Sequence, residues 1–140
     1  MISIKDYFGK YEGHADITPA RYANAQRLVA KVNTLMAAMM ADGVKFPDNP
    51  STKCQVAGTG NGGFRPQDCP VGAPGSAHKM GLAVDLYDPE GEIDNWLNNN
   101  IEARGLYEDL GLYFEALSST IGWSHWSLVA PKSGRRFFIP

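Results

Sequence analysis

The sequence lacks the charge imbalance and the long apolar runs that mark several classes of protein. Lysine and arginine total 13 against 15 aspartates and glutamates, which gives a net charge of -2. A nucleic-acid surface usually brings a basic excess, and a polybasic membrane anchor needs clustered lysines and arginines. No stretch approaches the roughly 18 apolar residues of a membrane span. We therefore expect no nucleic-acid partner and no membrane-spanning segment.

Cysteine is scarce, and the N-terminus has no apolar run of signal-peptide length. Two cysteines are too few for a disulfide scaffold, and 140 residues can bury a core without one. Charges at Lys5, Asp6 and Lys10 interrupt the first eleven residues. We therefore expect one monomeric domain over residues 1–140, made in the cytoplasm without a signal peptide. Any substrate outside the membrane would require delivery by other machinery.

The first predicted element is a helix that begins after Thr18. Thr18 is a typical N-cap, and Pro19 suits the first helical position because its missing N–H costs nothing there. Apolar residues then recur in steps of three and four, at Tyr22, Ala25, Val29, Val32, Met36 and Met39. Asp42-Gly43 ends the helix, with Gly43 as a left-handed cap. Its methionine-rich end, including Met40, is expected to pack in the core.

A long segment rich in proline and glycine follows, over residues 45–75. Only Cys54–Gly58 has the composition of a short strand. Irregular segments of this length inside a domain are usually functional or disordered. The glycine cluster at residues 58–63 is not followed by Lys-Ser/Thr, so it is not favoured as a phosphate-binding loop.

The second half of the chain predicts short elements. Residues 82–87 have the pattern of a strand, and residues 88–91 that of a turn. Helical spacing follows at Ile93, Trp96, Leu97 and Ile101, and residues 106–110 are expected to add another helical turn. Three short strands are expected at residues 112–117, 123–129 and 136–139. Helices first and strands later favour an α+β fold, with a small antiparallel sheet packed with helices.

Two of the three histidines stand in informative settings, whereas His14 lies in a polar stretch and is expected at the surface. His78 ends the long loop, and Asp85 lies within the strand that follows, with apolar neighbours on both sides. His125 alternates with Trp123 on a later strand. Taken singly, Asp85 is interpreted as a structural carboxylate and His125 as a residue packed among aromatic side chains.

Taken together, these three side chains form a set of metal ligands. Two neutral imidazoles and one carboxylate leave a bound zinc ion with one net positive charge and an open position for water, as hydrolytic zinc sites do. His78, Asp85 and His125 can converge if their strands are neighbours. We therefore predict Zn2+ as the cofactor.

The motifs around these residues resemble those of the M15 zinc peptidases. Residues 76–85 match Ser-x-His-x-x-Gly-x-Ala-x-Asp at every fixed position, and Trp123-Ser124-His125 is similar to the family's late Trp-x-His strand. Gly63-Phe64-Arg65-Pro66 is similar to the family's Gly-Tyr-Arg-Pro segment, whose arginine contacts substrate. Further segments resemble small phage-encoded M15A-type proteins across most of the chain. The resemblance implies the α+β fold shared by DD-peptidases and the hedgehog signalling domain.

The chain departs from the family where many members place their general base. The acid expected three residues before the last histidine is replaced by Gly122. The nearest upstream acid is Glu115, which could reach the metal-bound water if its strand pairs with residues 123–129. We predict Glu115 as the catalytic base; a surface glutamate is the alternative, and Asp88 and Asp109 are weaker candidates.

Candidate substrate contacts are Arg65, Ser76 and Trp123. Arg65 could hold a peptide carboxylate or polarise a carbonyl, or it could form a salt bridge that tethers the loop. Ser76 could hydrogen-bond a zinc ligand or cap the turn. Cys54 and Cys69 could form a disulfide in an oxidising compartment or remain two thiols.

These features predict a hydrolase of the metallopeptidase class. The expected reaction is zinc-dependent cleavage of peptidoglycan stem-peptide amides, by a D,D-carboxypeptidase or endopeptidase or by an L-Ala-D-Glu endopeptidase. The resemblance implies a bacteriophage endolysin or virion-associated lysin, delivered to the cell wall by a holin or injection machinery. The alternative is a non-catalytic zinc-stabilised domain that binds the cell wall or belongs to the virion. The scissile bond, host and delivery route stay open.

Overall fold

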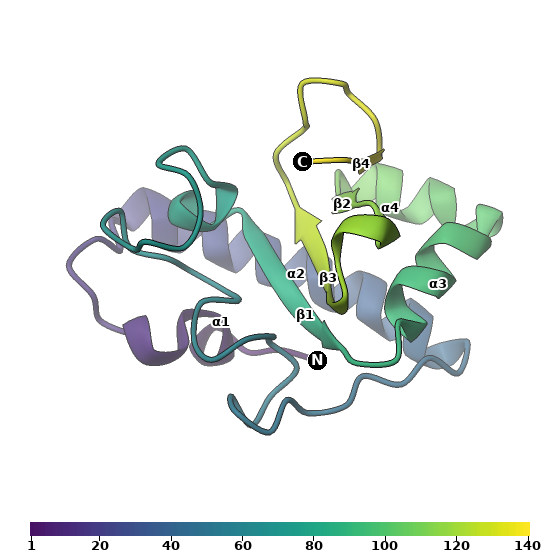
Figure 1. The fold of residues 1–140 in the computed structure, drawn as a ribbon, viewed down its shortest axis with the longest axis horizontal. Helices are drawn as coiled ribbons and strands as arrows, with labels where there is room; N and C mark the ends of the chain where they lie inside the picture. The colour runs from purple at the N-terminus through teal and green to yellow at the C-terminus, as the bar shows by residue number, and fades with distance from the viewer.

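A computed structural model describes all 140 residues as one long helix, several short helices and a four-stranded sheet (Figure 1). The helices are α1 (Ile4–Phe8), α2 (Pro19–Ala41), α3 (Glu92–Asn99) and α4 (Arg104–Leu110), and the strands are β1 (Ala83–Asp88), β2 (Tyr113–Glu115), β3 (Gly122–Ser127) and β4 (Phe137–Phe138). Short 3-10 turns lie at Gly9–Tyr11, Ala77–Met80, Ile101–Ala103 and Leu117–Ser119. None of the helices combines the length and apolar character needed to cross a membrane.

Helix α2 begins and ends where the sequence predicts. The Thr18 hydroxyl accepts a hydrogen bond from the Arg21 amide at 3.2 Å, and Pro19 occupies the first turn. The helix ends at Asp42-Gly43, with Gly43 at a φ of +90°. Two residues expected on the buried face are exposed: Tyr22, near the start of the helix, is 41% exposed, and at its end Met40 is 48% exposed. Because Met40 follows the buried Met39 by one residue, it points about 100° away from the buried face.

The fold class is α+β, as predicted, but the sheet is mixed. Its strand order is β1-β3-β2-β4, and the β1–β3 and β2–β3 pairs are antiparallel. Strand β4 pairs with β2 in parallel, so the expectation of a wholly antiparallel sheet is wrong. The cause is the connection over residues 128–136, which carries the chain from β3 past β2 to the far edge instead of returning it by a hairpin.

The sheet has one apolar face and one face that carries the candidate site. Val84 and Leu86 of β1, Phe114 of β2 and Trp126 of β3 belong to a single core cluster of 21 buried residues. That cluster includes the apolar side of α2, which runs behind the sheet in Figure 1. The alternation of a strand therefore turns Asp85 and His125 to the opposite face.

The long segment between α2 and β1 is irregular but hydrogen-bonded. It lies along the free edge of β1, where Ala57 and Tyr87 amides donate to the carbonyls of Asp85 and Gln55, and the Asp85 amide donates to Gly62. The short strand expected at Cys54–Gly58 is reduced to an isolated bridge between Val56 and Leu86. This segment protects the sheet edge from other chains, because its own backbone satisfies the edge groups.

Candidate metal centre

Three elements bring His78, Asp85 and His125 together. His78 lies in the 3-10 turn that precedes β1, Asp85 in β1 and His125 in β3. The β1–β3 register pairs Asp85 directly with His125. One potential ligand atom from each residue lies within 4.8 Å of the others. The side chains predicted as metal ligands therefore form one cluster that could hold a metal ion.

The Asp85 carboxylate is the centre of this cluster. Its Oδ1 accepts a hydrogen bond from His125 Nδ1 at 2.8 Å and lies 3.4 Å from His78 Nε2. Its Oδ2 accepts a hydrogen bond from Arg65 Nη2 at 3.2 Å. Burial alone would raise the pKa of Asp85, but the two facing imidazoles and their hydrogen bonds hold it well below its ordinary value. The carboxylate is therefore ionised and available as a ligand.

The orientation of His78 is fixed from behind. The residue is 3% exposed, and its Nδ1 donates to the Gly63 carbonyl at 2.8 Å. This bond directs Nε2 toward Asp85, where it lies 3.4 Å from Oδ1. Metal-binding histidines almost always donate their other ring nitrogen in this way, to a carbonyl or a carboxylate.

His125 is held by Asp85 and by neighbouring rings. Its ring lies 5.2 Å from that of His78 and 6.0 Å from that of Phe138, measured between centroids. Burial lowers its pKa, but the hydrogen bond and charge of Asp85 outweigh burial and raise it. A cation bound here would displace the proton shared by His125 and Asp85, as metals do when they bind protonated ligands.

The donor set fits zinc. Neutral imidazole and carboxylate are ordinary zinc ligands, and three protein ligands leave a coordination position open. The Gly63 carbonyl behind His78 and the Arg65 guanidinium behind Asp85 supply the outer contacts that such ligands require.

Glu115 lies in the same cavity as the three candidate ligands. A cavity of about 520 Å³ is lined by His78, Asp85, His125 and Glu115. Strand β2 pairs with β3 through Phe114 and Trp126, so continuing the register by one residue sets Glu115 beside His125. Burial raises the pKa of Glu115 above its ordinary value, while the nearby His125 opposes this rise. A carboxylate in this position can accept a proton from water inside the cavity.

The other acids considered for this role are placed elsewhere. Asp88 is buried, but its two carboxylate oxygens accept the amides of Ile93 and Asp94 at 3.1 Å and so cap α3. Asp109 is exposed on α4 and does not line the cavity. Gly122 opens β3 with a φ of +93° and has no side chain to contribute.

The predicted substrate contacts also line the cavity, with structural contacts of their own. Arg65 is buried, and besides its bond to Asp85 it donates from Nε to the Asn61 carbonyl at 2.6 Å. Ser76 accepts the His78 amide at 3.3 Å and caps the 3-10 turn. Trp123 is half-buried in the cavity wall.

Lys79 is a site-supporting residue that sequence reasoning missed. It is 3% exposed, and its Nζ donates to the carbonyls of Gln67 and Cys69 at 3.1 and 3.0 Å. Because Lys79 directly follows His78, these two bonds hold the loop over residues 67–69 against the 3-10 turn that carries His78. No pattern in the sequence indicates this, because Lys79 occupies a variable position of the motif.

The remaining candidates lie apart from the cluster. The His14 side chain is 36% exposed and lies beside Asp16. Cys54 and Cys69 are buried free thiols, and the structure has no disulfide between them.

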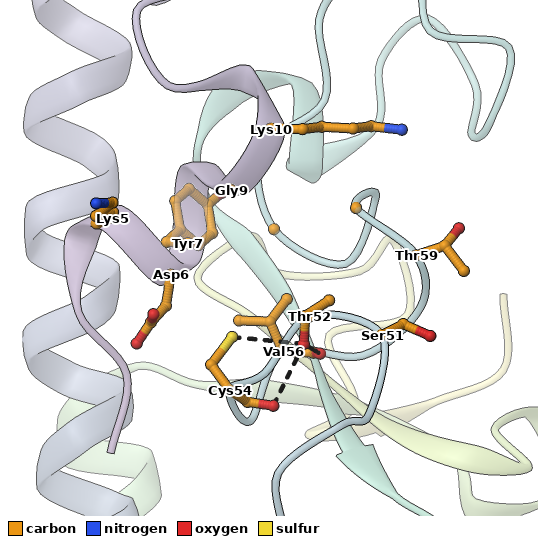
Figure 2. Close-up of a pocket in the computed structure, with 12 residues that line it drawn as sticks. Lys5, Asp6, Tyr7, Gly9, Lys10, Ser51, Thr52, Cys54, Val56 and Thr59 are labelled. Carbon is orange, nitrogen blue, oxygen red and sulfur yellow. Dashed lines mark hydrogen bonds between the residues drawn. The ribbon is translucent and has the colours of Figure 1, made fainter.

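A second cavity, of about 350 Å³, lies between α1 and residues 51–60 and contains none of the three candidate ligands (Figure 2). The Thr52 hydroxyl in its wall donates to the Cys54 and Val56 carbonyls and so holds this loop. The wall contains no cluster of metal-binding side chains, so we place the candidate chemistry at His78, Asp85 and His125.

No family model matches the chain, and no curated protein or solved structure matches it. The function therefore has to be inferred from the chemistry of the cluster around Asp85.

Proposed function

We propose that the protein is a zinc metallopeptidase that hydrolyses amide bonds in the stem peptides of peptidoglycan. The observation that carries this proposal is the convergence of His78, Asp85 and His125 in one cavity with Glu115. The motif resemblance to M15 peptidases supplies the substrate class, the hedgehog/DD-peptidase fold and the role of a phage lysin as parts of the same proposal.

The chain's own residues would divide the work as follows. A zinc ion held by the two histidines and Asp85 would supply Lewis acidity, which activates water and polarises a carbonyl. Glu115 accepts the proton from the attacking water and passes it to the departing amine. Arg65 keeps one oxygen of Asp85 occupied and so fixes the direction of the other.

The walls of the cavity leave room for a peptide beside the candidate ligands. Much of the lining consists of residues with little or no side chain, namely Gly72, Ala73, Ser76, Ala77, Ser127 and Ala130. Trp123 and Phe138 supply larger apolar surfaces. Stem peptides rich in alanine suit such a wall, because methyl groups can contact it without requiring deep pockets.

A second candidate function is a zinc-stabilised binding domain without catalytic activity. Gly122 favours it, because the position of the family's acid has no side chain. In that case zinc binding would persist, but replacing Glu115 would change nothing that can be measured on a substrate.

The test is to load the purified protein with zinc, measure metal content and incubate it with isolated muropeptides. We expect one zinc per chain and new peptide fragments by mass spectrometry, both lost when a chelator removes the metal. Cleavage that persists in a chelator after zinc is removed would refute the proposal, as would zinc-loaded protein that cleaves nothing.

A further inference from the structure

A cavity between α4 and the segment that enters β4 contains three arginines. We call it the arginine pocket; its volume is about 410 Å³, and it is lined by Arg104, Tyr107 and Glu108 of α4 and by residues 134–137. Phe137 lines this pocket, whereas the next residue, Phe138, lines the cavity of the candidate metal centre. Because successive side chains of a strand point to opposite faces, the two cavities lie on opposite sides of β4.

The arginine pocket is positively charged. Its three arginines and one glutamate leave a net charge of +2, in a chain whose overall net charge is -2. Arg104 Nε donates to Glu108 Oε1 at 2.7 Å, and this bond holds the pKa of Glu108 below its ordinary value. The bond leaves the two Nη groups of Arg104 without a partner. The Arg135 side chain has no partner either, since only its backbone amide is bonded, to Ser133 Oγ.

The third arginine, Arg136, is held in place before any ligand binds. Its Nη1 donates to the Leu112 carbonyl at 2.8 Å, and its guanidinium carbon lies 4.1 Å from the centre of the Tyr113 ring. These contacts leave Nε and Nη2 available. Because a fixed guanidinium loses little conformational entropy when it binds an anion, it gives more affinity than a mobile one.

Tyr107 adds a hydroxyl that has no partner within the protein. The residue is 4% exposed, and its ring packs edge-on against Phe114 and Phe137. Buried tyrosines usually find a hydrogen-bond partner, but the Tyr107 hydroxyl takes part in none of the protein's hydrogen bonds. The only fully enclosed unpaired side-chain atom belongs to Gln55, so the Tyr107 hydroxyl can be reached from the pocket. Burial raises the pKa of Tyr107, and the hydroxyl therefore keeps its proton and can donate a hydrogen bond.

A smaller hollow of about 240 Å³ adjoins the arginine pocket, and we call it the asparagine hollow after Asn98 and Asn100 in its wall. Arg104, Tyr107 and Phe137 line both cavities. A ligand bound to the arginines can therefore extend into the asparagine hollow.

The asparagine hollow combines hydrogen-bond acceptors with apolar surface. Nδ2 of Asn98 and of Asn100 donates to the backbone carbonyl four residues earlier, at 2.7 and 3.0 Å. Their Oδ1 atoms accept no hydrogen bond from the protein, so they are available to hydroxyl groups of a ligand. Ile101 is 84% exposed and lines the same hollow. Sugars have both complementary features, namely hydroxyls that donate and C–H groups that contact apolar side chains.

We propose that the protein binds a sugar phosphate at this site, with the phosphate in the arginine pocket and the sugar in the asparagine hollow. A phosphate monoester carries close to two negative charges at neutral pH, which matches the net charge of the pocket. Its oxygens point in several directions and can accept from more than one guanidinium and from the Tyr107 hydroxyl, whereas one guanidinium satisfies both oxygens of a carboxylate.

The distribution of charge favours a compact anion over a nucleic acid. A duplex is bound by cations spread along an extended face, whereas these arginines surround one cavity of an acidic chain. The sugar phosphate can be free or part of a glycan. Neither cavity shares a residue with that of the candidate metal centre, so this proposal does not depend on the proposed function.

The first test is calorimetric titration of the purified chain with N-acetylglucosamine 6-phosphate, N-acetylglucosamine and inorganic phosphate. We expect the sugar phosphate to bind at least about tenfold more tightly than the other two, because only it occupies both cavities. The affinity should be the same with and without zinc. Equal affinity for inorganic phosphate would overturn the assignment of the sugar, and no binding of the sugar phosphate would overturn the whole proposal. A glycan fragment with the same phosphate identifies the source: if it binds, the source is a glycan, and if only the monosaccharide binds, the source is a free sugar phosphate.

The second test locates the phosphate by substitution. Arg135→Gln should weaken binding of the sugar phosphate about tenfold, and Tyr107→Phe about fivefold without lowering Tm, because the hydroxyl has no partner within the protein. Arg27→Gln is the matched control, since Arg27 is exposed on α2 and lines neither cavity, and it should bind as the parent does. Equal affinity of Arg135→Gln and Arg27→Gln would show that the phosphate is not bound in the arginine pocket.

The third test separates the two halves of the ligand. Asn98→Ala should weaken binding of the sugar phosphate about fivefold and leave inorganic phosphate unaffected, because it removes an acceptor that only the sugar reaches. Equal weakening of both ligands would contradict the division of the ligand between the two cavities. A DNA duplex is the last probe. If it binds more tightly than the sugar phosphate, and Arg27→Gln weakens it as much as Arg135→Gln does, the arginines attract anions without forming a specific site and the proposal is overturned.

Discussion

Replacing Glu115 with glutamine removes the proposed proton acceptor while keeping the shape of the side chain. The amide of glutamine cannot take a proton from water, but it fills the same part of the cavity that holds the candidate ligands. None of the candidate ligands is altered, so one zinc should still bind per chain. Catalysis and metal binding therefore separate in this variant, which they do not in a ligand variant.

The size of the effect follows from the role and setting of the side chain. A positioned general base contributes about 10²–10⁴ in rate, or roughly 3–5 kcal/mol of barrier. Burial raises the pKa of Glu115, which means that the folded protein holds its charged form at a cost. The neutral glutamine avoids this cost, so Glu115→Gln should unfold at the same temperature as the parent or higher. A loss of rate with no loss of stability is typical of a residue kept for function.

The assay measures kcat/KM for cleavage of a cross-linked muropeptide dimer. Zinc content and thermal unfolding are measured on the same samples. Glu90→Gln serves as the control, since Glu90 is an exposed glutamate in the turn before α3. A Glu115→Gln variant with full zinc and a rate within about threefold of the parent would refute the assignment of Glu115 as base.

Three further perturbations test the metal centre and the fold. His78→Ala should lose stoichiometric zinc, measured by elemental analysis, while circular dichroism stays that of the folded chain. Gly72→Ala places a Cβ 2.9 Å from Arg65 Nη1 and should weaken zinc binding about tenfold, measured by competition with a chelator. Gly134→Ala is the control, because Gly134 also has a positive φ but lies in open space, and this variant should bind zinc as the parent does. Burial raises the pKa of Asp94, so the folded protein binds the proton of this carboxyl group more tightly than the unfolded chain does. The stability that protonated Asp94 contributes is therefore lost as the pH rises above the ordinary carboxyl pKa. Urea unfolding between pH 4 and pH 7 should show this loss in the parent and a smaller one in Asp94→Asn; equal slopes would contradict it.

The parts of the fold that depend on local sequence were predictable, and the path of the chain was not. Helix α2 was predicted because Thr18 and Pro19 start it and a regular apolar spacing sustains it. The direction of β4 depends on where residues 128–136 cross the sheet, and no local pattern specifies this. The methionine-rich composition of the helix end predicts Met40 in the core, whereas the helical period places it outside, where it is exposed.

The cluster of candidate ligands was predictable, and the contacts that support it were less so. The alternation of β1 indicated that Asp85 leaves the apolar face, and the motif brought His78 into its vicinity. The pairing of Asp85 with His125 across forty residues follows from strand register, which the sequence left undetermined. For Arg65 two roles stayed open, because its contact with Asp85 forms only after the loop has folded over β1.

The glycines of the long loop explain why so irregular a segment can carry this site. A Cβ at Gly63 would lie 1.9 Å from the Tyr7 carbonyl, and one at Gly62 would lie 2.3 Å from the Ala57 carbonyl. Only glycine permits these approaches, and through them the Gly63 carbonyl reaches His78 Nδ1. Helix α1 and the candidate metal centre are therefore linked through the backbone of Gly63. A substitution at Gly63 would disturb both at once, whereas the added Cβ of Gly72→Ala would meet only Arg65 and Ser76, which line the cavity of the candidate site.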